Sequence, residues 1–269
     1  MDCDRKGIIL AGGRGTRLHP LTAAISKQLL PIYNKPMIFY PLSVLMLAGI
    51  REIAVITCPH EQSKFKQLLG NGEQWGIEIS FISQPSPDGI AQAYILAEDF
   101  LNNTPSALIL GDNIFFGHGL TESLLRLSTK KKGAAILGYR VNDPQAYGVI
   151  SLNSSNEITA LTEKPLMPES NYVATGLYFL DNTAVARAQS LTPSKRGELE
   201  IIDLLKTYLD DNMLDAEILG RGFAWLDAGT VDTLLDAGNF VRTLEMRQGQ
   251  KIADLSEIAM KNKWIKKTD

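Results

Sequence analysis

Glycine and arginine residues are grouped near the start of the chain in a pattern suited to binding phosphate. Residues 10–18 read Leu-Ala-Gly-Gly-Arg-Gly-Thr-Arg-Leu. Because glycine has no Cβ, the backbone N–H groups of such a turn can approach a phosphate chain closely, and Arg17 adds positive charge. A tight turn between a strand and a helix would also use glycine. The position directly after the first predicted strand, where α/β sheets open their ligand crevice, favours a phosphate-binding loop.

Two known phosphate-binding fingerprints do not fit this turn. The dinucleotide pattern G-x-G-x-x-G fails when it starts at Gly13, because Leu18 stands at the third glycine position. The second predicted strand ends in Thr57-Cys58-Pro59, where a dehydrogenase would carry an acidic residue for the ribose. The P-loop pattern G-x-x-x-x-G-K-[ST] is absent from the sequence. The sequence therefore disfavours a dehydrogenase and a P-loop nucleotide hydrolase.

Two aspartates follow short apolar strands. Asp112 comes after Ala-Leu-Ile-Leu-Gly, and Asp227 comes after Phe-Ala-Trp-Leu and is followed by Ala-Gly-Thr. Each could be a turn residue or a helix cap. As a pair at the carboxyl edge of a sheet they would suit Mg²⁺, which takes one or two protein carboxylates and completes its shell with water and substrate phosphates.

Other charged residues could assist such a site. Lys27, within Ser-Lys-Gln-Leu-Leu-Pro, is either a solvated side chain or a second cation beside the phosphate loop. Glu163-Lys164-Pro165 follows a predicted strand and is either an exposed charged turn or an acid for sugar hydroxyls beside a cation for a phosphate. The three histidines have no zinc-ligand spacing and are expected to be surface or packing residues: His19, His60 and His118.

Short β-branched runs alternate with longer helical patterns, which is typical of β-α-β units around a parallel sheet. We therefore predict an α/β fold with a Rossmann-like, mainly parallel sheet flanked by helices, in one domain spanning residues 1–269. A nucleotide-binding half would reach about residue 148, and residues 149–269 would form an elaborated second half. Predicted strands are 7–10, 53–57, 77–82, 107–110, 134–139, 148–152, 157–161, 174–180, 215–219 and 223–226, and predicted helices are 36–48, 61–69, 90–101, 182–190, 198–210 and 231–247.

Composition excludes several classes of protein. The chain has 269 residues, long enough for a sizeable core, and its formal net charge of -3 provides no global basic field for a nucleic acid. No run of apolar residues approaches the ~20 needed to span a bilayer, and no apolar signal region follows the polar start, so we expect a cytoplasmic protein. The two cysteines, Cys3 and Cys58, cannot form a disulfide framework, which fits a reducing compartment.

Taken together, these segments resemble the sugar nucleotidyltransferases, most closely the glucose-1-phosphate thymidylyltransferase branch of bacterial cell-surface sugar synthesis. The pattern LAGGxGTRL with a distant KxLLP is specific to the superfamily, and QPSPDG with WLDxGT indicates the thymidylyl branch. The resemblance extends over nearly the whole chain through LAGGRGTRLHPLT, SKQLLPIYNKPMIFYPLSVLMLAGI, QPSPDGIAQA, LGDNIFFG, YGVI, EKP, ATGLYF, KRGELEIID and GRGFAWLDAGT.

The resemblance implies a Rossmann-like core, a homotetramer, dependence on Mg²⁺, and the condensation of dTTP with α-D-glucose 1-phosphate to dTDP-glucose and pyrophosphate. By the same resemblance, Arg17 and Lys27 would be catalytic residues at the triphosphate, and Asp112 and Asp227 catalytic metal ligands. The nucleotide site would comprise Leu10, Gly12, Gly13, Gly15, Thr16, Gln28, Gln84 and Gly89, with the last two reading the base. The sugar phosphate site would comprise Asn113, Gly148, Glu163, Lys164, Tyr178 and Arg196.

The chemistry of these substrates explains why no histidine-based catalytic set is needed. A sugar 1-phosphate has a second pKa of about 6, so at neutral pH its dianion can attack the α-phosphorus of dTTP without a general base. Catalysis then consists of neutralising charge and aligning the attack opposite pyrophosphate. Two alternatives are a pyrophosphorylase that uses UTP or another sugar 1-phosphate, and a non-catalytic regulatory subunit that binds a sugar nucleotide. The latter would be expected to lack one of the charged residues.

Overall fold

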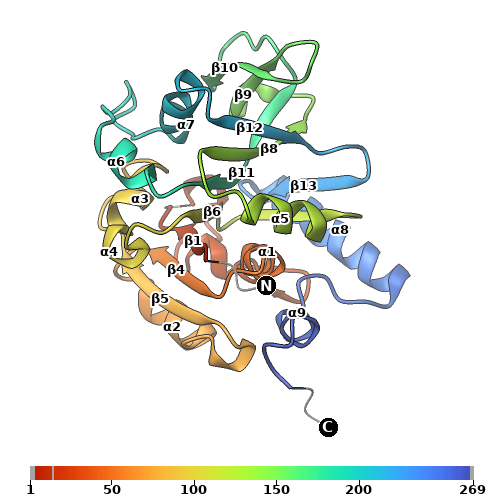
Figure 1. Ribbon diagram of the computed structural model, residues 1–269. Coiled ribbons are helices and arrows are strands. Elements are labelled where there is room, and N and C mark those ends of the chain that lie inside the picture. Colours follow the sequence, from red (N-terminus) through yellow and green to blue (C-terminus); the bar gives the residue numbers. More distant parts are fainter. Residues whose placement is uncertain (1–3, 14, 267–269) are drawn as a thin grey trace.

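A mixed, mostly parallel sheet runs through the molecule and is flanked by helices (Figure 1). The computed structural model describes residues 4–13 and 15–266, so Cys3 and Arg14 of the sequence patterns lie outside the described residues. In these residues no helix has the length and apolar character needed to cross a membrane.

The N-terminal part of the chain contributes four parallel strands to the sheet. Strand β1 (Lys6–Ala11) lies between β4 (Glu52–Thr57) and β6 (Ser106–Leu110), and β4 also pairs with β5 (Glu78–Ser83). Their carboxyl ends therefore share one edge of the sheet, as the alternating pattern predicts.

The second half of the sheet is joined to the first by an antiparallel strand. Strand β11 (Tyr172–Leu180) pairs with β6 on one side and with β8 (Ala134–Arg140) and β9 (Gly148–Leu152) on the other. Strand β10 (Ile158–Glu163) pairs with β9 in antiparallel orientation, and β12 (Leu214–Ile218) pairs with β8 in parallel orientation. Strand β8, which the alternation suggested as a further parallel strand, is thus antiparallel to its neighbour β11.

The central strands are apolar on both faces because helices cover both. In β1, Ile9 and Ala11 face one buried cluster and Ile8 faces the other, which is the two-residue period of a strand. The first face is covered by α1 (Phe39–Leu47), α2 (Gln62–Leu69), α5 (Leu120–Ser128) and α9 (Leu255–Lys261). The second is covered by α3 (Gln92–Leu96), α4 (Glu98–Leu101), α6 (Ala184–Gln189) and α7 (Ile201–Asp210).

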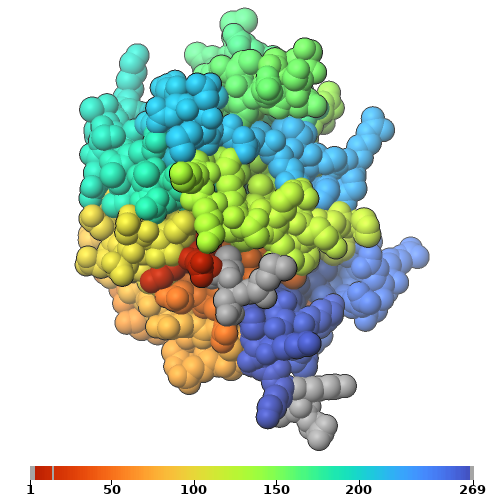
Figure 2. Space-filling model, in the orientation of Figure 1, coloured from red at the N-terminus to blue at the C-terminus, as the bar shows by residue number. Residues whose placement is uncertain are grey.

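A small ribbon and a long helix complete the fold beside the sheet. Strands β7 (Asn113–Gly117) and β13 (Phe223–Asp227) pair in antiparallel fashion, and α8 (Val231–Gln248) follows β13 directly. Thr230 begins α8 with a capping box in which its side chain accepts from the Thr233 N–H. In Figure 2 the orange and yellow segments lie at the lower left of this face, the green segments lie at the top, and the darkest blue segments lie at the lower right. Two-residue strands β2 (Pro31–Ile32) and β3 (Lys35–Pro36) form a further pair.

The predicted fold class is confirmed, and the ten predicted strands are present within a few residues of their expected bounds. The predicted helix over 90–101 is wrong in one respect, because it is divided at Ala97 into α3 and α4. Sequence patterns did not predict β7, α5, α9 or the β2–β3 pair.

The buried Asp181 carboxylate is not one of the predicted site residues, so its substitution tests what stabilises the fold. It is 3 % exposed and accepts hydrogen bonds from Thr183, from the Gly133 N–H at 2.7 Å and from the Tyr208 hydroxyl at 2.9 Å. Burial alone would raise the pKa of Asp181, but these donors outweigh burial and lower it.

Asp181→Asn is expected to lower the free energy of unfolding by about 2–3 kcal/mol at pH 7, because the asparagine NH₂ group would face N–H or O–H donors that the carboxylate accepts from. Since the folded-state pKa of Asp181 lies below the unfolded value of about 3.9, the contribution is complete above that pH and is lost as the pH falls through the folded value. Urea unfolding of wild type and variant at pH 7 and at pH 3 measures the difference, with the exposed Asp99→Asn as control. Equal midpoints at pH 7 would contradict the assignment.

Candidate active site

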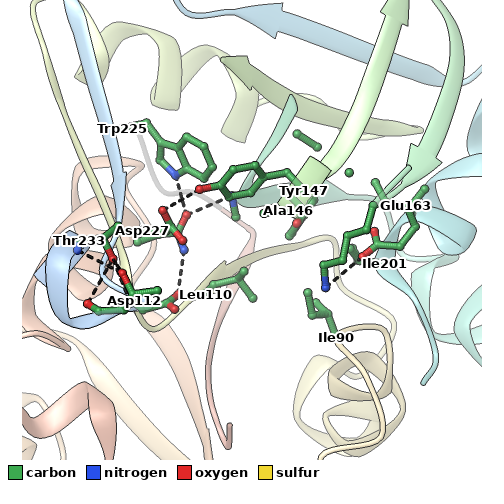
Figure 3. Close-up of a pocket in the computed structure, with 18 of the residues that line it drawn as sticks. Ile90, Leu110, Asp112, Ala146, Tyr147, Glu163, Ile201, Trp225, Asp227 and Thr233 are labelled. Carbon is green, nitrogen blue, oxygen red and sulfur yellow. Dashed lines mark hydrogen bonds and ion pairs between the residues drawn. The ribbon is translucent and has the colours of Figure 1, made fainter. Parts of the chain in front are cut away.

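A cavity of about 710 Å³ opens where strands of both halves of the sheet end. Figure 3 shows Asp112, Asp227, Tyr147 and Trp225 on one side of it and Glu163 with Ile90 and Ile201 on the other. Its wall combines charged, aromatic and apolar residues, which are Arg17, Ile90, Leu110, Asp112, Asn113, Ala146, Tyr147, Gly148, Glu163, Lys164, Ala174, Gly176, Tyr178, Ile201, Ile202, Trp225, Asp227, Thr230 and Thr233.

Asp112 lies in the two-residue connection between β6 and β7. Its Oδ2 is 2.5 Å from Lys27 Nζ, and its Oδ1 accepts a hydrogen bond of 2.9 Å from the Asn113 side chain. Burial alone would raise the pKa of Asp112, but the Lys27 ammonium outweighs burial and lowers it. The carboxylate is therefore held charged, beside a cation that comes from a segment 85 positions earlier in the chain.

Asp227 is brought to Asp112 by strand pairing. It is the last residue of β13 and stands opposite Asn113 in the antiparallel register with β7. The Tyr147 hydroxyl donates to its Oδ1 over 2.9 Å. Burial raises the pKa of Asp227, the Tyr147 hydrogen bond opposes this, and the negative charge of Asp112 raises it further.

Arg17 lies beside Asp227 because residue 229 has no side chain. A Cβ on Gly229 would be 2.9 Å from Arg17 Nη2 and 3.4 Å from Asp227 Oδ2. Glycine at this position therefore leaves room for the guanidinium at the end of the cavity where both carboxylates lie. Arg17 itself is carried by a short helical turn, η1 (Thr16–Leu18), directly after the glycine-rich loop.

The donor set at this end suits a hard divalent cation. Two carboxylates face one cavity, and the charge of each opposes that of the other, which a divalent cation would relieve. Among residues 4–13 and 15–266, no cluster of three or more His, Cys, Asp or Glu side chains could hold a metal ion on its own. Two carboxylates with the remaining ligands from water and substrate phosphate is the arrangement that Mg²⁺ prefers.

Asn113 connects three strands at the floor of the cavity. Its Oδ1 accepts from Trp225 Nε1 at 2.6 Å and from the Gly176 N–H at 3.2 Å, while its Nδ2 donates to Asp112. The side chain is 2 % exposed. These bonds fix the side chain and, through it, the orientation of the Asp112 carboxylate.

The opposite side of the cavity carries Glu163 and its cations. Lys164 Nζ is 3.4 Å and Arg196 Nη2 is 3.2 Å from Glu163 Oε1, and Arg196 also pairs with Glu200 at 2.7 Å. Burial raises the pKa of Glu163, Lys164 opposes this, and Glu200 raises it further. Lys164 has φ of 41°, a left-handed conformation uncommon outside glycine. Arg196 is not among the residues that line the cavity.

Isoleucine residues make part of the wall between these two charged sides. Ile201 and Ile202 begin α7, and Ile90 comes from the loop before α3. A Cβ on Gly148 would be 2.3 Å from Ile202 Cδ1, so glycine permits this side chain to pack against the β9 backbone. The cavity therefore offers apolar surface between its polar ends.

The residues expected to bind nucleotide gather around the glycine-rich loop rather than in the cavity wall. Gly15 has φ of 61° and lies against Lys27 and Thr22, and Gly12 lies against Gln84. The other expected residues near this loop are Leu10 in β1, Gly13, Thr16 in η1 and Gln28, which packs on Gly111. Gly89, with a φ of 111°, lies against Leu199, shortly before α7.

The structure thus brings eight of the expected site residues into one cavity: Arg17, Asp112, Asn113, Gly148, Glu163, Lys164, Tyr178 and Asp227. Sequence reasoning missed Tyr147 and Trp225, which contact each other with ring centroids 5.2 Å apart. Trp225 stands two residues before Asp227 on the same strand, and a two-residue period places both on one face. That spacing could have identified it.

Sequence comparison with known proteins identifies relatives that share one name. A family model described as nucleotidyl transferase matches residues 6–243. The chain is 56% identical over 261 residues to the "Glucose-1-phosphate thymidylyltransferase" of Xanthomonas campestris pv. campestris strain B100, covering 97% of this chain and 88% of the relative. It is 54% identical over 264 residues to the protein of the same name from Neisseria gonorrhoeae, covering 98% and 92%.

Solved structures also resemble this one. A putative glucose-1-phosphate thymidylyltransferase from Bacillus anthracis, in complex with a sucrose, is 37% identical with a TM-score of 0.82 and covers 88% of this chain and 95% of its own. A UDP-glucose pyrophosphorylase complexed with UDP-glucose is 24% identical with a TM-score of 0.79, covers 89% and 99%, and is similar in fold.

Proposed function

The chain belongs to the nucleotidyl transferase family, and we propose that it transfers a thymidylyl group from dTTP to α-D-glucose 1-phosphate, forming dTDP-glucose and pyrophosphate. Relatives named glucose-1-phosphate thymidylyltransferase, about half identical to this chain over nearly its full length, support this activity.

One structural observation carries the proposal for this chain. Asp112, from the β6–β7 connection, and Asp227, from β13, line one cavity, with Lys27 bonded to the first and Arg17 beside the second. Two anions and two cations in this arrangement match a reaction in which a triphosphate and a phosphate monoester must be brought together.

We assign Mg²⁺ to Asp112 and Asp227. When bound, it would neutralise charge on the triphosphate and help to orient it. Lys27 and Arg17 would contact phosphate oxygens, and Arg17 would contribute most where negative charge grows on the departing pyrophosphate. Tyr147 would keep the Asp227 carboxylate oriented through its hydroxyl.

The sugar phosphate is assigned to the other end of the cavity. Lys164 and Arg196 would attract its phosphate, and Glu163 would accept hydrogen bonds from sugar hydroxyls. Asn113, Gly148 and Tyr178 would complete the surface around the ring. No side chain needs to remove a proton, because the phosphate dianion is itself the nucleophile.

The nucleotide is assigned to the glycine-rich loop and its neighbours. Gln84 and Gly89 would contact the base, and the remaining assigned residues are Leu10, Gly12, Gly13, Gly15, Thr16 and Gln28. The resemblance of the sequence also implies a homotetramer. Exposed apolar side chains of α8, Val231, Leu235 and Met246, support a subunit contact there.

The proposal is tested by measuring pyrophosphate release with a panel of nucleoside triphosphates and sugar 1-phosphates. We expect dTTP with glucose 1-phosphate to be the preferred pair. Since one methyl group contributes about 0.8 kcal/mol and at most about 3 in a tight pocket, dUTP should follow within roughly 10- to 200-fold in kcat/KM. UTP should follow within the same range unless the pocket has no room for its 2′-hydroxyl, and the difference between dUTP and UTP measures the effect of that hydroxyl. Purine nucleotides should be much poorer.

A parallel preparation of Asp112→Asn controls for activity contributed by the expression host. Release that is equal in both preparations would identify a contaminant and would favour a non-catalytic subunit that binds a sugar nucleotide. A preference for UTP over dTTP, or for another sugar 1-phosphate, would replace the substrate named here. Rejection of dUTP by more than about a thousandfold would show that methyl burial is not the discriminating contact.

A further inference from the structure

A chain of side-chain amides and one carboxylate adjoins the glycine-rich loop. Gln84, directly after β5, is 2 % exposed and donates from Nε2 to Gln92 Oε1 over 2.7 Å. Gln92, the first residue of α3, donates from its own Nε2 to Asp88 Oδ2 over 2.9 Å. Its Oε1 also accepts from the Asp88 backbone N–H at 3.2 Å. Ile90, between Asp88 and Gln92, lines the main cavity, so this loop borders the site.

The chemistry of Asp88 allows only one orientation of the Gln92 amide. A carboxylate accepts hydrogen bonds and a backbone N–H donates them. The Asp88 carboxylate requires the NH₂ of Gln92, and the Asp88 N–H, which also donates to the Ser86 carbonyl at 3.0 Å, is paired with the Gln92 oxygen in that same orientation. The two ends of the amide cannot be exchanged without placing donor against donor and acceptor against acceptor.

This orientation is passed on to Gln84. Because the oxygen of Gln92 faces Gln84, the Gln84 NH₂ must point toward Gln92 and its oxygen must point away. The oxygen then lies over the glycine-rich loop, where a Cβ on Gly12 would be only 1.9 Å from Oε1. One N–H and the oxygen of Gln84 are left for a ligand.

The backbone around Asp88 is held independently of these side chains. The Leu199 N–H donates to the Asp88 carbonyl at 2.7 Å, and the Ala91 N–H donates to the Leu199 carbonyl at 3.0 Å. A side-chain substitution at position 88 or 92 therefore leaves these backbone bonds in place.

We propose that Asp88 and Gln92 are positioning residues that hold the Gln84 amide in one orientation and thereby determine which pyrimidine the protein accepts. The proposal rests on the proposed function, in which Gln84 contacts the base. Thymine and uracil present an N–H donor at N3 beside a carbonyl acceptor at C4. Cytosine presents an acceptor at N3 beside an amino donor. In the observed orientation the Gln84 oxygen can accept from N3–H of thymine or uracil while its NH₂ donates to the C4 carbonyl. In the reversed orientation the NH₂ would face N3 of cytosine and the oxygen would face its amino group.

The test compares kcat/KM for dTTP and dCTP, each with glucose 1-phosphate, in wild type and Gln92→Met. Methionine has a similar length but cannot orient Gln84. The preference for dTTP should fall by about 10-fold or more, because Gln84 can then reverse and pair with cytosine. Gln62→Met, which removes the amide bonded to Ser83 at the end of the same strand, should leave the preference unchanged.

A second variant is designed to keep the orientation of the Gln84 amide with different side chains at positions 88 and 92. In the double variant Asp88→Asn with Gln92→Glu, residue 92 can only accept, so Gln84 must still point its NH₂ toward it, and the asparagine can donate in return. This variant should retain the wild-type preference for dTTP within about threefold, even if both rates fall.

The outcomes separate the inference from the proposed function. If wild type does not use dTTP, the proposed function fails. If wild type uses dTTP but Gln92→Met lowers kcat/KM for dTTP and dCTP by the same factor, Gln92 has only a structural role and the inference is wrong. Loss of the preference in the double variant would also overturn it. Circular dichroism melting of each variant, together with dissociation constants for dTTP and dCTP without sugar phosphate, shows whether the altered preference arises in binding by a folded protein.

Discussion

Replacing Asp112 or Asp227 by asparagine is expected to lower kcat by at least about 1,000-fold while the protein stays folded. Both carboxylates face the same cavity and are assigned to Mg²⁺. An amide of the same shape cannot neutralise the cation, so the triphosphate would be left with unbalanced charge and poorer alignment.

The two variants should differ in stability because the two aspartates have different neighbours. Asp112→Asn leaves the Lys27 ammonium, 11% exposed, without its carboxylate and should lower the free energy of unfolding by about 1–3 kcal/mol. Asp227→Asn removes a charge that Asp112 opposes, so its stability should equal or exceed that of wild type.

Steady-state rates over a range of Mg²⁺ measure the effect of each substitution on kcat, and Mn²⁺ titration followed by electron paramagnetic resonance measures its effect on metal affinity. Asp236→Asn on the exposed side of α8 provides the matched control and should change neither. A near-normal rate at saturating Mg²⁺ in either variant would remove that residue from the metal site.

Arg17→Ala is expected to lower kcat by about 100-fold with a smaller change in the KM for dTTP. The guanidinium lies beside Asp227 and Gly229, at the end of the cavity assigned to the triphosphate. Its contact should strengthen as the bond to pyrophosphate breaks, and an interaction that grows in the transition state acts on kcat.

Lys164→Ala provides the contrast, since the contact proposed between Lys164 and the sugar phosphate would be made before the reaction as well as during it. That variant should mainly raise the KM for glucose 1-phosphate. Initial rates with each substrate varied separately distinguish the two effects, and the exposed Arg221→Ala controls for loss of a positive charge. A raised KM in Arg17→Ala with an unchanged kcat would show that the two roles are assigned wrongly.

Sequence patterns predicted elements well where burial imposes a period. Strand β6 is apolar from Ala107 to Leu110 because both of its faces are covered, and such a run is visible without a structure. Strand β7 was missed although its partner β13 was predicted. Its sequence, Asn-Ile-Phe-Phe-Gly, is short, directly follows another strand, and acquires its conformation by pairing with residues more than a hundred positions later.

The sequence by itself determined the kinds of group available and their local placement: a glycine-rich turn after the first strand, and an acidic residue after each of two short apolar runs. Local propensity and period carry that information. The tertiary structure alone decided the side-chain pairs of the candidate site, Lys27 with Asp112, Tyr147 with Asp227, and Trp225 with Asn113. These partners lie 80 to 112 positions apart, so their contacts depend on strand order and register, which arise only when the whole sheet assembles around its core.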